Sequence, residues 1–302
     1  MPVIKYFEIL GKVIESNIAQ YATLRKITYD AAYTEVVRHL INNSNEWKSG
    51  RQPQIPYHDP LCRIAYLYGI AAANANLVEK AFRECTDLQN HIEELQARND
   101  QVCVCAFGGG PGTELLAIAK WVDKNRPSLQ ITLDYLLLDK VSEWIESWQA
   151  IKRQIELRFR ADMGSKANWP LTLNGTFSGI DITDTSGFAN YGNVFGQDIY
   201  IMSYFVSEVF DDMESLKDFT KMMVAHAPIN SKFLFIDRNE QKWKRSITEI
   251  ADEAGISLDR FHDVSGNMDN DESKTDLGKI FDSVKWTPRL TWNAFWVLGT
   301  KN

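Results

Sequence analysis

The stretch Q-V-C-V-C-A-F-G-G-G-P-G-T-E-L-L-A-I-A-K, residues 101–120, sets the fold that the chain is expected to adopt. Residues 102–107 are a short apolar, β-prone run of the length of a buried strand. Four glycines then fall within five positions, and residues 114–120 resume with helical spacing. Such a turn can cradle a nucleotide, because glycines let backbone approach a ligand and a helix N-terminus offers free N–H donors. It also occurs as a tight βα turn without a ligand.

The spacing of the glycines distinguishes between known families of nucleotide-binding loops. A pyrophosphate-binding fingerprint reads G-x-G-x-x-G, whereas glycines here recur at every second position around Pro111. Followed by Thr113 and Glu114, the loop resembles motif I of the class I S-adenosylmethionine-dependent methyltransferases. The resemblance implies that S-adenosylmethionine is the cofactor and that the loop wraps its amino acid and ribose. The loop residues implied in binding are Gly108, Gly109, Gly110 and Gly112.

Composition limits the class of partner. The chain has 302 residues, 44% hydrophobic and 24% charged, as in a soluble globular protein of one large or two small domains. Its net charge is −7, whereas nucleic-acid-binding proteins are usually basic, so a nucleic-acid acceptor is disfavoured. A small-molecule or protein acceptor is expected instead. The sequence does not indicate an oligomeric state.

The cysteines and the first residues indicate the compartment. The four cysteines show no zinc-ligand spacing, so free thiols and no metal are expected. The first residues do not resemble a signal peptide, and no apolar run approaches the ~20 residues of a membrane span. A cytoplasmic protein without membrane contact is therefore expected.

Residues 1–98 are expected to form an all-helical N-terminal cap or lid, ahead of a Rossmann-like domain over residues 99–302. Apolar residues recur at helical steps over residues 3–14 and 29–41, with a polar stop at residues 42–45. Most of this region fits helices packed on a core.

A polar set inside this region has two interpretations. Asp59 and Pro60 mark a helix start within it. The set fits either a lid over the cofactor, as in relatives with added N-terminal helices, or a hydrogen-bonded interface between helices. Its members are Tyr57, His58, Arg63, Tyr66, Tyr68, Asn74 and Asn76.

After the glycine loop, strand and helix patterns alternate. Strand-like runs occur at residues 129–138, 172–185, 198–210, 232–236, 258–264 and 292–298, and helical stretches at 141–160 and 241–254. The last run resembles the terminal antiparallel strand of the class I methyltransferase fold. The expected fold class is therefore α/β, a doubly wound and mostly parallel seven-stranded sheet with an antiparallel last strand.

Carboxylates follow the second and third strands. Asp139 stands where a carboxylate can accept two hydrogen bonds from a ribose diol, and it matches the acidic residue of the family's motif II. Asp139 could instead cap the following helix. Asp181 and Ile182 resemble the family's adenine-contacting pair, although aspartate at a strand end is also common in turns. Trp144 would pack near the adenine or in the core.

The fourth strand is expected to form the mouth of the site, because ligands of open α/β sheets bind at the carboxyl ends of the strands. This places Ser203, Tyr204, Ser207 and Glu208 near the transferred methyl group, with Ser203 as a cofactor-binding residue and Tyr204 and Glu208 as catalytic candidates. The family's tetrapeptide for amine methylation, Asn/Asp-Pro-Pro-Tyr/Phe, is absent here, and so is a cysteine. Their absence disfavours methylation of a nucleobase amine and the cysteine route to 5-methylcytosine.

Glu208 is the main candidate for a general base, with His58 and His262 as alternatives. Glu208 could instead cap the next segment or pair with Arg63 or Arg238. The polar triplet at residues 237–239 could orient an acceptor, or its asparagine could cap the next helix. The acidic stretch at residues 265–285 does not fit a calcium loop and is expected to be solvated and mobile.

The sequence thus predicts a methyltransferase whose small-molecule or protein acceptor lies between the helical cap and the carboxyl edge of the sheet. Two alternatives stay open. One is a methyltransferase acting on RNA of the ribosomal type, and the other is a catalytically silent module that binds S-adenosylmethionine.

Overall fold

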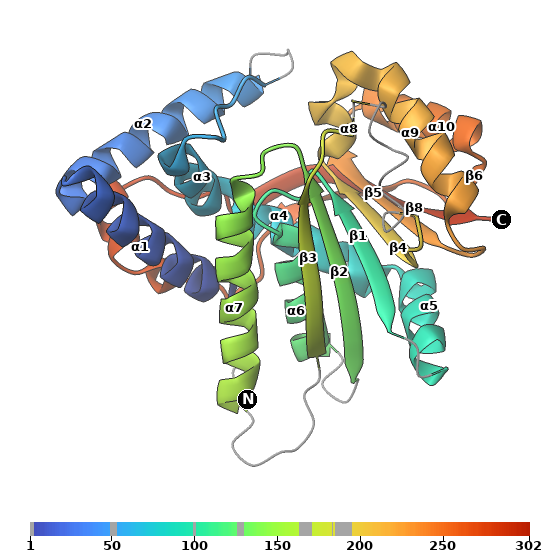
Figure 1. Ribbon diagram of the computed structural model, residues 1–302, viewed down its shortest axis with the longest axis horizontal. Coiled ribbons are helices and arrows are strands. Elements are labelled where there is room, and N and C mark those ends of the chain that lie inside the picture. Colours follow the sequence, from blue (N-terminus) through green and yellow to red (C-terminus); the bar gives the residue numbers. More distant parts are fainter. Residues whose placement is uncertain are drawn as a thin grey trace.

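The computed structural model describes residues 3–48, 53–98, 101–125, 130–162, 171–182, 184 and 195–302. Figure 1 shows a twisted central sheet with helices on both faces and the N-terminal helices gathered at one side. The glycine-rich stretch folds as predicted, with β1 (Val102–Phe107) leading through the glycine turn into α6 (Thr113–Asn125).

The sheet is doubly wound and mostly parallel, as predicted. β1 lies inside the sheet between β2 and β4, and the strands run in the order β3-β2-β1-β4-β5-β8-β6. Only β8 breaks the parallel run, because it pairs antiparallel with β5. The strands are β2 (Ile131–Asp139), β3 (Leu171–Gly179), β4 (Ile199–Ser203), β5 (Lys232–Arg238), β6 (Ile256–Leu258), β7 (His262–Asn267) and β8 (Thr291–Lys301).

β6 and β7 together make the final edge. Both pair antiparallel with β8, where Leu258 lies opposite Gly299 and His262 lies opposite Trp296. The register shifts by one residue between the two segments, so they form two halves of one edge strand with a bulge between them. Counting β6 and β7 as one edge strand, the sheet of the described residues has seven strands, and the antiparallel β8 lies next to the edge. The predicted fold class is confirmed.

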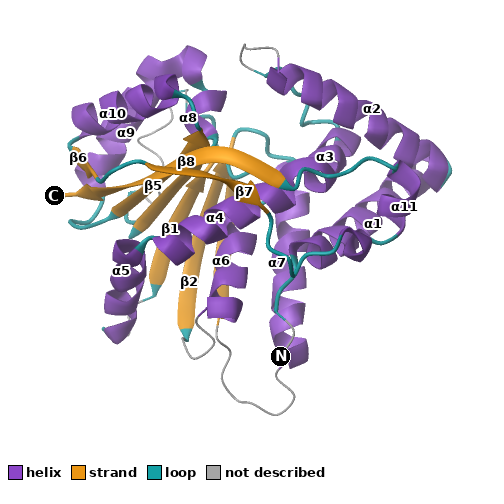
Figure 2. Cartoon of the chain, turned by 180° about the vertical axis from the view of Figure 1, so that it is seen from behind, coloured by secondary structure: helices purple, strands orange, loops and turns teal. Residues whose placement is uncertain are grey.

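Each face of the sheet has its own core. Val104 and Ala106 of β1 point into one cluster with α4 (Ala72–Glu84), α6 and α7 (Trp144–Asp162). Figure 2 shows α4 and α6 on this face of the sheet. Cys105 and Phe107 point into the other cluster, with α9 (Met213–His226) and α10 (Gln241–Ala254). α5 (Thr86–Ala97) packs beside β1 on the first face. This alternation explains why β1 is apolar on both faces.

The N-terminal helices run longer than the sequence suggests. α1 (Tyr6–Arg25) is followed by α2 (Tyr29–Lys48), which continues through the polar residues 42–45 that were expected to end it. Asn43 is buried there, with its amide 3.5 Å from Cys62 Sγ, so a tertiary contact outweighs the local stop signal.

A helix start predicted at Asp59 is confirmed. Its carboxylate accepts a 2.8 Å hydrogen bond from the Leu61 amide, and Pro60 opens α3 (Pro60–Tyr66). A π-helical turn, Leu67–Ala71, joins α3 to α4 without a break. The resulting Pro60–Glu84 helix is long and apolar enough to cross a membrane by composition alone, which the sequence analysis missed, but 89% of its apolar window is buried inside the fold. It is therefore placed as a core helix.

The acidic stretch at residues 265–285 is not a solvated loop, and that prediction is wrong. It contains the last part of β7, a short 3₁₀ turn (Lys274–Leu277) and α11 (Lys279–Val284). The Glu272 side chain is 2% exposed and accepts the amides of Tyr6 and Phe7, at 2.8 and 3.1 Å, which caps α1.

The charges of this acidic stretch are neutralised by cations from elsewhere. Lys120 on α6 is fully buried, with Nζ 2.7 Å from Glu272 and 3.1 Å from Asp271. Lys124, one turn further on, binds Asp269 at 2.7 Å. The sequence of this stretch shows only that it is acidic. Its cationic partners lie about 150 residues away in the chain, so no local pattern reveals them.

Candidate functional site

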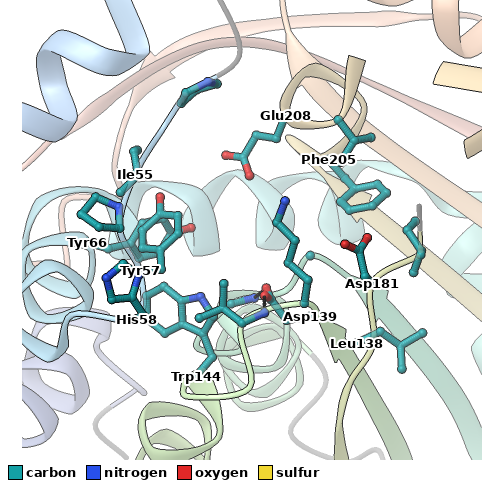
Figure 3. Close-up of a pocket in the computed structure, with 18 of the residues that line it drawn as sticks. Ile55, Tyr57, His58, Tyr66, Leu138, Asp139, Trp144, Asp181, Phe205 and Glu208 are labelled. Carbon is teal, nitrogen blue, oxygen red and sulfur yellow. Dashed lines mark hydrogen bonds between the residues drawn. The ribbon is translucent and has the colours of Figure 1, made fainter. Parts of the chain in front are cut away.

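A cavity of about 420 Å³ opens at the carboxyl ends of β1, β2 and β3 (Figure 3). This is the edge where open α/β sheets bind ligands. The segment leading into α3 closes it on one side, and α8 (Phe205–Glu208) closes it on another. The predicted residues that line it are Gly108, Gly110, Asp139, Asp181, Ile182 and Glu208, together with Trp144, Tyr57, His58 and Tyr66.

The glycine loop has a backbone that only glycine adopts easily. Gly108, Gly110 and Gly112 have φ angles of +58°, +49° and +87°. A Cβ on Gly108 would lie 2.5 Å from Phe205, and one on Gly112 would lie 2.7 Å from Trp148. Gly108 and Gly110 border the cavity, whereas Gly109 and Gly112 shape the loop behind it.

Asp139 ties this loop to the end of β2. One carboxylate oxygen accepts the Gly110 amide at 2.9 Å, and the other accepts the Val141 amide at 2.8 Å. α7 begins only at Trp144, so Asp139 does not cap that helix, but braces the turn before it. Burial raises the pKa of Asp139 to about 6, against the lowering effect of the two amides. Each oxygen keeps a lone pair that can accept a ligand hydroxyl.

An aromatic wall faces Asp139 across the cavity. The rings of Tyr57, Tyr66 and Trp144 contact one another, with centroids 5.2 to 5.7 Å apart. Trp144 also lies 3.5 Å from the position of a Cβ on Gly110, which places it at the cavity and not only in the core. The Tyr57 hydroxyl is buried without a hydrogen-bond partner among the described residues.

The predicted polar set divides between site and scaffold. Tyr57, His58 and Tyr66 line the cavity, and Arg63 lies behind them. The Arg63 guanidinium donates to the carbonyls of Tyr57 and His58, at 2.9 and 3.0 Å, and pairs with Glu146 at 3.1 Å. Arg63 therefore fixes the segment that bears the aromatic wall, and its ion pair is not with Glu208.

The other members of the set lie deeper. The Asn74 amide donates to the Tyr66 hydroxyl at 3.3 Å, and the Tyr68 hydroxyl donates to the Trp286 carbonyl. Asn76 is buried, and its amide group has no partner in the described part of the chain. The hydrogen bonds of Asn74 and Tyr68 support the hypothesis of a polar helix interface, which Asn76 does not, while the cavity-lining tyrosines support that of a lid.

The fourth strand is shorter than predicted. β4 ends at Ser203, and Tyr204 turns the chain with φ +57° while its amide donates to the Ile236 carbonyl at 2.7 Å. Residues 205–208 form the helical turn α8. The strand and the helical turn are both buried, so their residues form one continuous apolar run. This run shows no change of hydrophobic periodicity at the point where β4 ends and α8 begins. Ser203 lines neither this cavity nor the next one.

Asp237 holds this turn in place. It is fully buried at the end of β5, and one of its oxygens accepts the Ser207 amide at 2.9 Å. Burial raises the pKa of Asp237 to about 6. Asp237 is therefore a positioning residue for Glu208 and does not face the crevice, whereas Arg238 and Asn239 do. α10 begins after Glu240, so Asn239 does not cap that helix.

A second cavity of about 540 Å³ adjoins the first. It lies between the π-helical turn, α2 and the ends of β5 and β8, and it is bordered by Tyr204, Arg238 and Asn239. Glu208 and Trp47 line both cavities. Glu208 therefore stands where a ligand in one cavity would meet a ligand in the other.

The Glu208 carboxyl titrates near neutrality. Burial raises its pKa to about 7, with Asp139 and Asp237 raising it further and with Arg238 and Lys140 opposing. A carboxyl group with such a pKa can accept a proton at physiological pH. His262, in contrast, stacks on Trp296 at 3.9 Å and lines neither cavity, and His58 lines only the first.

Sequence reasoning did not single out Glu114, a buried acidic residue that packs behind the glycine loop at Gly109 and does not line either cavity. It opens α6 directly behind the glycine loop, is 3% exposed, and one carboxyl oxygen has no hydrogen-bond partner in the described chain. Burial raises the pKa of Glu114 to about 8, and the nearby Asp139 and Glu208 add to the shift. Its position after the motif was visible in the sequence, but its burial was not.

Glu114→Gln is expected to flatten the dependence of stability on pH. Because the folded pKa of Glu114 lies above its unfolded value, its stabilising effect is complete at low pH and is lost as pH rises toward about 8. Between pH 5.5 and pH 7.5, the free energy of unfolding of the wild type should therefore fall by up to about 1.4 kcal/mol more per pH unit than that of the variant. Urea unfolding across this range measures the difference, and parallel curves would show that Glu114 is ionised in the fold.

No family model matches the chain, and neither does any curated protein sequence. Solved structures similar in fold include an S-adenosylmethionine-dependent methyltransferase from Methanosarcina mazei, 11% identical over 67% of this chain and 92% of that chain, with a TM-score of 0.40. The N-methyltransferase NodS from Bradyrhizobium japonicum is 10% identical over 72% of this chain and 98% of its own, with a TM-score of 0.37. The pyocyanin biosynthetic protein PhzM is 11% identical over 94% of this chain and 67% of its own, with a TM-score of 0.44. These likenesses are remote, so the residues of the cavities themselves carry the interpretation.

Proposed function

We propose that the protein is a methyltransferase that uses S-adenosylmethionine. One observation carries this proposal: the positive-φ glycine loop and Asp139 face one cavity, and Glu208 joins that cavity to a second one. A methyl transfer needs two ligands held side by side, because its rate depends on the alignment of donor and acceptor.

The first cavity fits the cofactor in shape and charge. Gly108 and Gly110 bring the loop backbone to the border of the cavity, and the spare lone pairs of Asp139 suit the two ribose hydroxyls. Ile182 and Asp181 border the part that would receive the adenine. Its lining bears three carboxyl groups against one lysine, Lys140, which favours a ligand with a sulfonium and an ammonium over a dinucleotide with a pyrophosphate.

The cofactor, when bound, supplies a methyl carbon on a positively charged sulfur, and the carbon–sulfur electron pair leaves with the sulfur. The residues of this chain orient the acceptor and manage its proton. Glu208 is placed to accept the proton that a hydroxyl or amine acceptor loses, and Asp237 keeps the turn bearing Glu208 in position. Tyr204 borders the acceptor cavity with a buried hydroxyl that can donate to the acceptor.

A catalytically silent module is the less suitable alternative. Such a module would need no second cavity, whereas here the two cavities share Glu208 and Trp47 as lining residues. A small-molecule acceptor suits a bordered cavity of about 540 Å³, which lies in the usual size range for small-molecule sites.

S-Adenosylmethionine and S-adenosylhomocysteine are expected to bind the wild-type protein at one site, at least about tenfold more tightly than NAD⁺. The reason is the negative lining of the first cavity, which repels a pyrophosphate. Isothermal titration calorimetry with the three ligands tests this. Tighter binding of NAD⁺ would contradict the proposed function.

A further inference from the structure

The second cavity differs in charge from the rest of the protein. The chain as a whole carries a net charge of −7, and the first cavity has an excess of carboxyl groups. The second cavity instead brings together three cations, Lys48, Arg238 and Arg289, against Glu208 and Glu240. With three cations against two carboxyl groups, the lining has an excess of positive charge. A local reversal of charge indicates a ligand that is negatively charged.

Arg238 is the cation best placed to bind such a ligand. It is the last residue of β5, is half-buried, and its guanidinium makes no hydrogen bond or ion pair with the described part of the chain. Its neighbour Asn239 lines the same cavity. A guanidinium offers two parallel N–H donors in the geometry of a carboxylate.

Arg289 is held in place at the other side of the cavity. Its backbone amide donates to the carbonyl of Gly69 in the π-helical turn at 2.7 Å, and its Nε donates to the Thr291 carbonyl at 2.7 Å. Its guanidinium carbon lies 6.0 Å from the centre of the Tyr204 ring. The Gly69 carbonyl of the π turn thus anchors the backbone of Arg289 at the border of the cavity. Such π turns are frequent at functional sites.

Aromatic and apolar side chains complete the lining. Trp47, Trp286 and Tyr204 present rings, and Leu40 and Ile70 add aliphatic surface. Flat rings suit a planar ligand, which can stack on them or meet them edge to face. Two carboxyl groups in the same lining disfavour a phosphate dianion relative to a single carboxylate.

We propose that this cavity binds an aromatic carboxylic acid as the methyl acceptor, with its carboxylate at Arg238 and its ring among Trp47, Trp286 and Tyr204. That the acid accepts a methyl group rests on the proposed function, whereas the binding of the acid in this cavity does not. Lys48 and Arg289 add positive charge at the border of the cavity.

Binding of a matched acid and amide tests the proposal. Calorimetry would compare 4-hydroxybenzoate, salicylate and anthranilate with the neutral 4-hydroxybenzamide, in the presence and absence of S-adenosylhomocysteine. We expect at least one acid to bind wild type roughly tenfold more tightly than the amide, because a hydrogen bond to a charged group is stronger than one to a neutral group. In Arg238→Gln the acid should lose this advantage, whereas Arg245→Gln, an exposed arginine on α10, should retain it.

The outcomes separate this inference from the proposed function. Failure of all three acids at millimolar concentration, or equal binding of acid and amide, would overturn the inference while S-adenosylhomocysteine still bound. Failure of S-adenosylhomocysteine with intact acid binding would instead overturn the proposed function. An RNA oligonucleotide that bound at micromolar concentration and displaced the acid would assign these cations to a phosphate backbone and overturn the inference as well.

Discussion

Asp139→Asn is expected to weaken the binding of S-adenosylhomocysteine by about 100-fold. The carboxylate faces the first cavity with spare lone pairs, and the substitution removes its charge from two hydrogen bonds with ribose hydroxyls. At about 1.5 kcal/mol for each hydrogen bond to a charged group, the loss is about 3 kcal/mol, or roughly two orders of magnitude in affinity. Isothermal titration calorimetry measures it directly.

A control on the same strand separates contact from folding. Asp134→Asn, five residues earlier on β2, borders neither cavity and should leave the affinity unchanged. Asp139 also braces Gly110, so thermal unfolding of both variants shows whether the loop has been lost. If Asp139→Asn kept full affinity, Asp139 would only brace the loop and would not contact the cofactor.

Lys120→Met is expected to destabilise the fold by about 3–5 kcal/mol. Lys120 is fully buried between Glu272 and Asp271, and its ammonium lies 4.2 Å from the centre of the Tyr6 ring. Removing it leaves buried carboxylates without a counter-charge, and breaking a buried ion pair from one side costs about this much. Urea unfolding, extrapolated to water, gives the free energy of unfolding.

Two further variants make this result specific. Lys12→Met removes an exposed i,i+4 pair with Glu8 on α1 and should cost at most about 0.5 kcal/mol. The double variant Lys120→Met, Glu272→Gln should be less destabilised than the sum of its single variants, because the stranded charge is removed together with its partner. If Lys120→Met lowered the free energy of unfolding by less than about 1 kcal/mol, the ion pairs of Lys120 with Glu272 and Asp271 would not stabilise the fold.

Sequence reasoning succeeded where the signal was local. β1 and α10 have the predicted bounds or contain them, because each is an apolar pattern bounded by breakers or polar residues. The helix start at Asp59 depends on one capping side chain and on the proline that directly follows it, so the sequence alone could predict it. Five of the residues expected at the cofactor line one cavity, because the ends of parallel strands meet at one edge of the sheet: Gly108, Gly110, Asp139, Asp181 and Ile182.

It failed where distant residues decide the outcome. Asn43 is held inside a helix by Cys62, and the acidic stretch is ordered by Lys120 and Lys124, whose proximity no local pattern reveals. The second cavity was not predicted because its lining comes from α2, the π turn, β5 and β8. Ser203 does end β4 at the expected edge of the sheet, but it lines neither cavity, which strand position alone does not reveal.

The capping of α1 by Glu272 has a consequence for how the chain reaches its native state. The two partners are separated by 266 residues, and Lys5 is tied to Asp276 across 271 residues. Emerging from a ribosome, α1 can coil early, but its docked position requires a segment translated much later. We therefore expect the first amides of α1 to stay without their cap during most of synthesis, so that this end of the helix reaches its native state only once residues 272–276 have been made.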